Sequence, residues 1–262
     1  MTRIQISPDL SLDAVEHGDG PLSVLIAGGF MDMDQWQPVA EALSGRSVRY
    51  DQRGVGDSDH PTEGYTIDQF ADDAIALIQT LDAGPALLIG NSLGGTVAMA
   101  VALKEPSLVR GLVLCATSAG PQGPPTPPES MQRMMRGASL PVEQAALAIM
   151  DILFATDFMD EHPEMLDAAI EKRLKGAPMI ATLGPLQSAL IFDPLEQLQS
   201  FAAPALILHG EDDELVLPVH AELLGEAIPN ATAQLIADAG HAMVVEQSEA
   251  VVAAIAEFVS GL

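Results

Sequence analysis

The chain has 262 residues, 48% of them hydrophobic and 18% charged, which is enough for one large domain with a buried core or for two small domains. Its 37 acidic and 11 basic residues give a formal charge of −26, which argues against a surface that binds nucleic acid or anionic lipid. Because no stretch approaches the roughly 20 apolar residues of a membrane span and the N-terminus lacks the apolar core of a signal peptide, we expect a soluble, cytoplasmic protein; its oligomeric state is left open.

Short apolar segments recur along the chain and predict the strands of a sheet. Near the N-terminus, residues 10–16 alternate between apolar and polar side chains, which favours an antiparallel edge strand. The later segments are apolar almost throughout, as expected for parallel strands that are covered on both faces. They span residues 23–27, 47–50, 86–89, 112–115, 205–208 and 234–237.

Helical patterns lie between these strands. The clearest begins at Thr66, where Thr66 and Gln69 have the spacing of a capping box, and it ends before Gly84. Further helices are expected over residues 36–43, 94–103, 219–228 and 251–259. The alternation predicts an α/β fold, a mostly parallel sheet with helices on both faces and with ligand chemistry at the carboxyl ends of the strands.

Residues 120–195 interrupt this alternation. They contain no clear strand pattern and open with five prolines between residues 121 and 128. We therefore predict a core of residues 1–119 and 196–262 with an inserted helical cap over residues 120–195. Seven of the chain's 12 methionines fall in this insertion: Met131, Met134, Met135, Met150, Met159, Met165 and Met179. Their flexible thioethers either line an adaptable apolar cavity or pack the helices together.

The pentapeptide Gly90-Asn91-Ser92-Leu93-Gly94 directly follows a predicted strand and precedes a predicted helix. A turn this tight needs glycines beside the serine, because side chains there would collide with the neighbouring strand and helix. The turn exposes the Ser92 hydroxyl at the positive end of the helix. Ser92 is therefore the candidate nucleophile.

Further stretches around this motif resemble those of the α/β-hydrolase superfamily, and the resemblance covers essentially the whole chain. They are residues 51–58 (DQRGVGDS, resembling D-x-R-G-x-G-x-S), 210–213 (GEDD, resembling the G-x-x-D acid loop) and 239–241 (AGH, resembling the histidine loop). The resemblance implies the superfamily's fold and a catalytic triad in the chain order Ser92, Asp213, His241. The chain looks closest to small esterases and enol-lactonases such as 3-oxoadipate enol-lactonase.

Elementary chemistry requires each partner of this triad. A serine hydroxyl needs a base to take its proton, and His241 can accept one at neutral pH and later return it to a leaving group. A carboxylate must then hold the other ring nitrogen. Asp213 has the family spacing, but Pro218 comes one residue later than usual, so the adjacent Asp212 stays an alternative.

A transition state with a negative oxygen also needs backbone N–H donors. The N–H of Leu93 is one candidate. The other lies in the turn after residues 23–27, where relatives carry His-Gly-x and this chain has Ala27-Gly28-Gly29-Phe30 without the histidine. Gly29 is the predicted donor and Phe30 the alternative. We expect the substrate pocket to include Phe30, Trp36, Met134 and Met243.

The implied reaction is acyl transfer to water, with neutral or apolar short-to-medium esters as the expected substrates because the protein is strongly acidic. An enol-lactone with a second carboxylate is the alternative, and Arg133 or Arg136 could then face it, although both could equally face solvent. A slow binding module of the same fold also stays open. Neither a cofactor nor a metal is predicted: the five other histidines lack ligand spacing, and the single Cys115 lies in an apolar strand.

Overall fold

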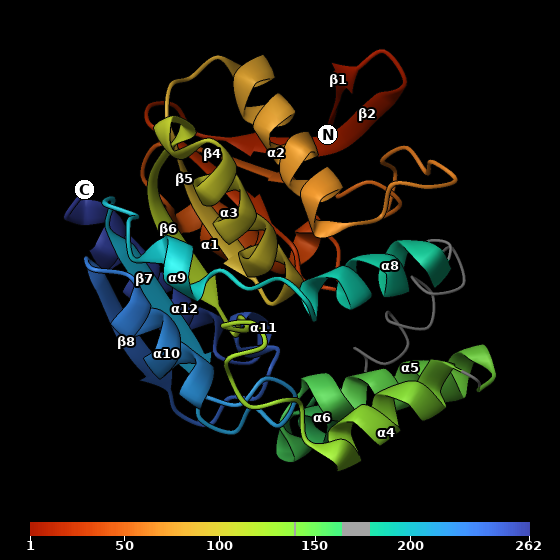
Figure 1. Ribbon diagram of the computed structural model, residues 1–262. Helices are drawn as coiled ribbons and strands as arrows, with labels where there is room; N and C mark the ends of the chain where they lie inside the picture. The colour runs from red at the N-terminus through yellow and green to blue at the C-terminus, as the bar shows by residue number, and fades with distance from the viewer. Residues whose placement is uncertain (139, 164–178) are drawn as a thin grey trace.

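The computed structural model describes residues 1–138, 140–163 and 179–262 (Figure 1). The described part forms one eight-stranded sheet in the order β1-β2-β4-β3-β5-β6-β7-β8. The strands are β1 Thr2–Ser7, β2 Leu10–His17, β3 Leu22–Ile26, β4 Arg46–Tyr50, β5 Ala86–Asn91, β6 Val109–Cys115, β7 Ala205–Gly210 and β8 Ala231–Ile236. Both pairings of β2 are antiparallel and the pairings from β4 to β8 are parallel. The six predicted apolar strands and the mostly parallel sheet are confirmed.

The N-terminal edge differs from the prediction. Residues 10–16 do form an antiparallel strand, β2, but β2 is not the edge, because β1 pairs with its outer side. A two-residue turn, Pro8 and Asp9, joins them, with Ser7 opposite Leu10. Proline and aspartate favour such turns. Since β1 buries only Ile4, its apolar pattern is too weak to show in the sequence.

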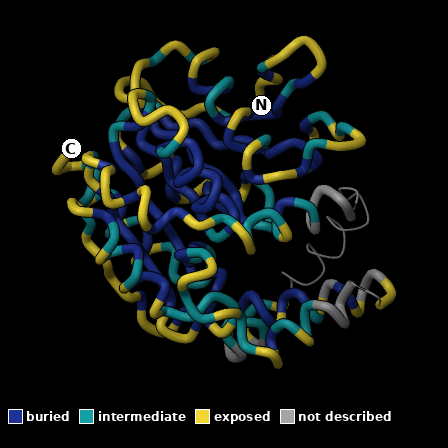
Figure 2. The backbone as a smooth tube through the Cα atoms, in the orientation of Figure 1, coloured by how far each residue is buried: buried dark blue, intermediate teal, exposed yellow. Residues whose placement is uncertain are grey.

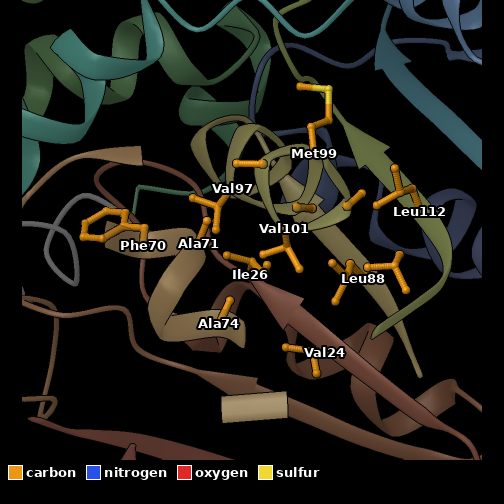
Figure 3. Packing of buried hydrophobic residues seen from close by; sticks show 14 of the residues in the cluster. Val24, Ile26, Phe70, Ala71, Ala74, Leu88, Val97, Met99, Val101 and Leu112 are labelled. Carbon is orange, nitrogen blue, oxygen red and sulfur yellow. The ribbon is translucent and has the colours of Figure 1, made fainter. Parts of the chain in front are cut away.

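Helices cover both faces of the sheet, and successive strand residues alternate between the two layers. The side chains of Val24 and Leu88 point toward the helical layer that is drawn in Figure 3, whereas those of Leu25 and Leu87 point toward the opposite helical layer. The first layer contains α2 Ile67–Leu81, α3 Leu93–Lys104, α9 Leu195–Leu198 and α10 Val219–Ala227. The second contains η1 Met33–Trp36, α1 Gln37–Ala42, α11 Met243–Glu246 and α12 Ser248–Ser260. Figure 2 shows the buried strands between these layers. The edge strand β8 is mostly exposed.

The first residues of α2 form the predicted N-cap but only half of the predicted capping box. The Thr66 hydroxyl accepts a hydrogen bond from the backbone N–H of Gln69, at 3.3 Å, as predicted for an N-cap. The side-chain oxygen of Gln69 instead accepts a hydrogen bond from the Arg53 guanidinium. Arg53 also forms a buried, two-pronged ion pair with Asp73 on α2. The motif at residues 51–58 therefore braces α2 against the sheet.

Every element that the structure describes between β6 and β7 is helical, apart from irregular connections. The helices are α4 Pro128–Ala138, α5 Val142–Leu153, α6 Thr156–Glu161, α8 Met179–Ala189 and α9. In Figure 1, α4, α5 and α6 lie together beyond the ends of the parallel strands, while α8 contacts α2 and α3. That residues 120–195 act as a separate cap stays a prediction. In the described ranges, no helix has the combined length and apolarity needed to cross a membrane.

Candidate active site

The turn between β5 and α3 holds Ser92 in a conformation that side chains rarely adopt. Its backbone has φ 52° and ψ −116°, which costs of order 1–3 kcal/mol. A Cβ atom at Gly90 would lie 2.3 Å from the Gly94 carbonyl oxygen, and one at Gly94 would lie 2.1 Å from the carbonyl oxygen of Ile26. The Ser92 N–H donates to the Cys115 carbonyl at 2.7 Å. Both glycines are therefore required by close backbone packing.

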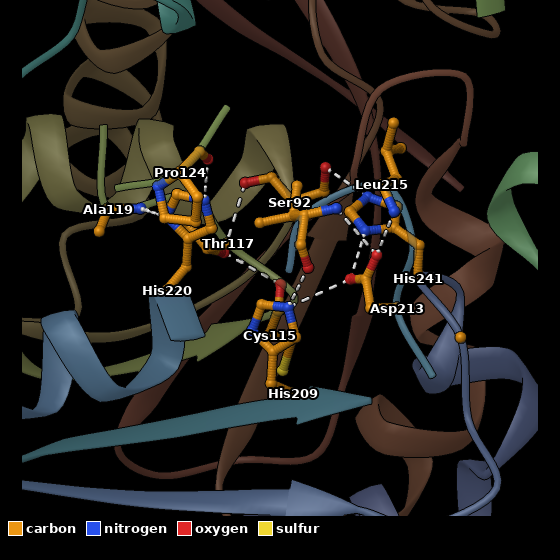
Figure 4. A network of polar contacts seen from close by, with 12 residues as sticks. Ser92, Cys115, Thr117, Ala119, Pro124, His209, Asp213, Leu215, His220 and His241 are labelled. Atoms are coloured by element: carbon orange, nitrogen blue, oxygen red, sulfur yellow. Dashed lines mark hydrogen bonds and ion pairs between the residues drawn. The ribbon is translucent and has the colours of Figure 1, made fainter. Parts of the chain in front are cut away.

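Three side chains that are far apart in the sequence meet at this turn (Figure 4). The Ser92 Oγ lies 2.8 Å from Nε2 of His241, and Nδ1 of His241 lies 2.8 Å from Oδ2 of Asp213. Because a carboxylate only accepts, Nδ1 carries the proton in the neutral ring, and Nε2 is free to accept from the hydroxyl. The neighbouring Asp212 is exposed. The geometry thus joins Asp213, not Asp212, to the histidine.

The Asp213 carboxylate is almost fully enclosed and surrounded by donors. Its Oδ1 accepts the backbone N–H groups of Leu215 and Val216, both at 2.9 Å. Its Oδ2 also lies 3.2 Å from Nε2 of His209. Burial alone would raise the pKa of Asp213, but His241 and His209 outweigh it and hold the pKa well below its usual range. Asp213 is therefore an anion at any pH near neutrality.

Two buried histidines beside the site escape the sequence analysis, which found only that they lack the spacing of metal ligands. His209 is the next-to-last residue of β7 and is fully buried. His220, on α10, accepts the Ala119 N–H at Nδ1 and donates from Nε2 to the Pro124 carbonyl. Burial lowers the pKa of His220. The one available signal for His209 was its position directly after four apolar strand residues.

The histidine loop is bonded to the inserted helices. The Glu246 carboxylate accepts the N–H of Ala155, at 2.8 Å, and the N–H of Gly240, at 3.1 Å. In addition, the Ala242 N–H donates to the Leu153 carbonyl at 2.7 Å. Burial raises the pKa of Glu246. The junction of α5 and α6 is therefore fixed directly to the loop that carries His241.

A small cavity lies beside Ser92 and His241. Its volume of about 10 Å³ is close to the minimum that one water molecule needs. Its lining comprises Gly29, Met31, Gln35, Asn91, Ser92, Leu153, His241, Ala242, Val244 and Val245. Gly29 is thus on the wall, while its neighbour Phe30 has φ 68°. Leu93 is the first residue of α3, where backbone N–H groups lack intrahelical acceptors. These placements keep Leu93 and Gly29, with Phe30 as the alternative, as candidate oxyanion donors.

In the described structure, the four residues expected in the substrate pocket do not line this cavity. Trp36 and Met243 are fully buried in the core beneath the sheet. Phe30 packs against the apolar cluster of α5, and Met134 is half-buried on α4. Periodicity could not show which side of η1 and α11 faces the site. Met165 and the side chains of Met135, Met179 and Arg136 lie outside the described residues.

One cation that the sequence offered for an anionic ligand, Arg133, is engaged by carboxylates. Arg133 pairs with Glu214 at 2.6 Å and with Asp151 at 3.5 Å. Among the described residues, no group of three or more His, Cys, Asp and Glu side chains is arranged to hold a metal ion.

Comparison with known proteins places the chain among relatives of similar architecture. The family model for the alpha/beta hydrolase fold matches residues 23–248. A thermophilic esterase from Thermogutta terrifontis is 28% identical with a TM-score of 0.85, over 100% of this chain and 99% of that one. The enol-lactonase from Burkholderia xenovorans LB400 is 25% identical with a TM-score of 0.84, over 97% and 98% of the two chains.

A longer relative matches by sequence. The polyketide synthase ThaQ of Burkholderia thailandensis is 34% identical over 254 residues, which is 92% of this chain but only 12% of the synthase. The match to the family model spans most of the chain, and the solved relatives match its whole length. The family and these relatives support a hydrolytic function. The chain belongs to the alpha/beta hydrolase fold family.

Proposed function

We propose that the protein is a serine hydrolase that cleaves carboxylic esters through a covalent acyl-enzyme. The observation that carries this proposal is the continuous chain of 2.8 Å contacts from Ser92 Oγ through the His241 ring to Asp213. The position of Ser92 on a strained turn at the carboxyl end of β5 also supports the proposal. Similarity to an esterase and to an enol-lactonase favours the same chemistry.

The geometry accounts for both halves of such a reaction. Ser92 Oγ attacks the carbonyl carbon while Nε2 of His241 takes its proton, and Asp213 stabilises the imidazolium that results. Backbone N–H groups of Leu93 and Gly29 would then bind the oxyanion. His241 returns the proton to the departing alcohol, which leaves an ester on Ser92. Water attacks this ester by the same steps, so the carboxylic acid is released and the enzyme is restored.

The charge of the chain narrows the substrate. A formal charge of −26 repels anionic ligands, and Arg133 is already paired with two carboxylates. We therefore favour neutral or apolar esters with short to medium acyl chains. In this proposal, helices of the insertion 120–195 act as a cap over the bound substrate. Hydrolysis of lactones is the second candidate, because the enol-lactonase matches nearly the whole chain.

A panel of 4-nitrophenyl esters of rising acyl length, with a set of simple lactones, tests the proposal. We expect Ser92→Ala to lower kcat/KM by roughly 10⁴-fold or more. Asp213→Asn should lower it by about 10³- to 10⁴-fold, whereas the matched control Asp212→Asn should change it less than about twofold. Hydrolysis that survives in Ser92→Ala would refute the assignment of Ser92.

Labelling of Ser92 by a fluorophosphonate distinguishes the enzyme from a binding module. An activated serine is labelled stoichiometrically at neutral pH, and the label is lost in Ser92→Ala and His241→Ala. A wild-type protein that neither reacts with the probe nor hydrolyses any ester or lactone would contradict the proposed function and favour the binding module.

A further inference from the structure

His209 has a fully buried side chain that the proposed reaction does not use. It stands near the end of β7, four residues before Asp213, and its ring lies beside the Asp213 carboxylate (Figure 4). Nε2 lies 2.7 Å from the Val216 carbonyl oxygen and 3.2 Å from Oδ2 of Asp213. Nδ1 is buried and has no hydrogen-bond partner among the described residues.

These contacts define the protonation of the ring. A carbonyl oxygen only accepts, so Nε2 must carry a proton to bond to Val216. A second proton on Nδ1 would create both a buried charge and a buried donor without an acceptor, each of which is costly. The ring of His209 is therefore neutral, and its single N–H is shared between Val216 and the carboxylate of Asp213.

The oxygen that His209 contacts is the same Oδ2 that accepts the Nδ1 proton of His241. Each donor that a carboxylate accepts withdraws electron density from the others. We propose that His209 is a positioning residue for the proposed hydrolase reaction: by sharing Oδ2 it fixes the direction of the Asp213 carboxylate and weakens its hold on the protonated form of His241. This inference rests on the proposed function.

Other charged groups around the pair act in the same region and stay constant in the test. Glu246, on α11, repels the Asp213 carboxylate, and His220, on α10, lies near both His209 and Asp213. The charge-assisted contacts of His209 and His241 also help to keep Asp213 ionised. The hydrogen bonds of Glu246 and His220 go to backbone groups and not to Oδ2, so a substitution at residue 209 changes a contact of Oδ2 and leaves those bonds in place.

Two substitutions separate the donor from the volume of the ring. His209→Phe keeps a ring but removes the N–H, whereas His209→Gln can place its side-chain N–H near the position of Nε2. We expect the phenylalanine variant to move the acidic limb of the kcat/KM profile, measured with 4-nitrophenyl butyrate from pH 5 to 9, upward by about 0.5–1 pH unit. The midpoint should move upward because the Asp213 carboxylate, with one donor fewer, stabilises protonated His241 more strongly. The glutamine variant should keep the wild-type midpoint.

A lower kcat with an unchanged midpoint in His209→Phe would overturn the proposal, because it would show a structural role alone. If that variant does not fold, nitrogen-15 spectra of the wild-type histidine rings decide: a proton on Nε2 and none on Nδ1 of His209 at pH 7 supports the proposal, and any other pattern overturns it. Failure of the proposed function is distinguishable, since it would appear as full activity in Ser92→Ala, or as a wild type that hydrolyses no ester or lactone and takes no label, whatever happens at His209.

Discussion

Asp51 gives the sharpest test of the electrostatic reasoning, because its carboxyl group is buried and has no cationic partner within the part of the chain that the structure describes. It directly follows β4, is 5% exposed, and its Oδ1 accepts the Met33 N–H at 2.8 Å. Burial raises the pKa of Asp51 from 3.8 to about 6; the Met33 N–H opposes this, and the nearby carboxylates of Asp32, Asp13 and Asp34 add to it.

The effect on stability follows from proton linkage. In the folded protein Asp51 keeps its proton up to about pH 6, whereas in the unfolded chain it loses it near pH 3.8. The folded state therefore gains relative stability below the lower pKa and loses it as the pH rises through the window between them. A difference of about 2.2 pKa units corresponds to ~3 kcal/mol lost at pH 8.

Asp51→Asn removes this pH-dependent cost and keeps an oxygen for the Met33 N–H. We expect its free energy of unfolding to exceed that of the wild type by up to ~3 kcal/mol at pH 8 and to equal it near pH 4. Urea unfolding of both proteins at five values between pH 4 and 8 measures this difference, in which the other carboxylates cancel. Asp57→Asn, at an exposed position of the same loop, is the control. A difference that does not vary with pH would refute the reasoning.

The remaining predictions concern contacts described above. Glu246→Gln loses one acceptor of the Ala155 and Gly240 N–H groups. We therefore expect the free energy of unfolding, measured with urea, to fall by about 2 kcal/mol and the kcat of ester hydrolysis to fall as well. An unchanged kcat would show that the histidine loop is held without this carboxylate. Asp73→Asn leaves the buried Arg53 guanidinium without its counter-ion and should cost about 3–5 kcal/mol; a wild-type urea midpoint would contradict this. Ser92→Gly removes the strain at φ 52° and should raise stability by about 1–3 kcal/mol while abolishing hydrolysis; a lower melting temperature would argue against stored strain.

The regular part of the fold could be predicted because its signals are local. Apolar runs such as residues 86–89 need only burial on both faces to become central strands, and Thr66 caps α2 through a contact three residues away. The serine turn was also visible as a five-residue pattern, and the clash that excludes a side chain at Gly90 is with the nearby Gly94, although the one at Gly94 is with the distant Ile26 carbonyl. The weakly apolar β1 was not, because it becomes a strand only through its pairing with β2.

Side-chain contacts between distant segments were harder to predict. The sequence does not show that His209 faces Asp213. This contact depends on the fold of the loop after β7, in which the Val216 carbonyl bonds to His209. Likewise, Glu246 reaches Ala155 across 91 residues. Trp36 was expected at the start of the helix after the turn with the predicted donor Gly29, where it could pack that helix or line the pocket; the orientation of η1 turns its indole into the core.

The bonds between the insertion and the histidine loop have a mechanical consequence. Leu153 and Ala155 are tied to residues 240–246, and Leu153 and Ala242 also line the space beside the serine. The cavity formed by the described residues has a volume of about 10 Å³, so the ester proposed as substrate would have to displace part of its lining. The Leu153 carbonyl accepts the N–H of Ala242, the residue next to His241, so a shift of the Leu153 backbone would act on the loop that carries the imidazole. For the proposed hydrolase, we therefore expect entry of an acyl group and the alignment of His241 to be coupled through these bonds.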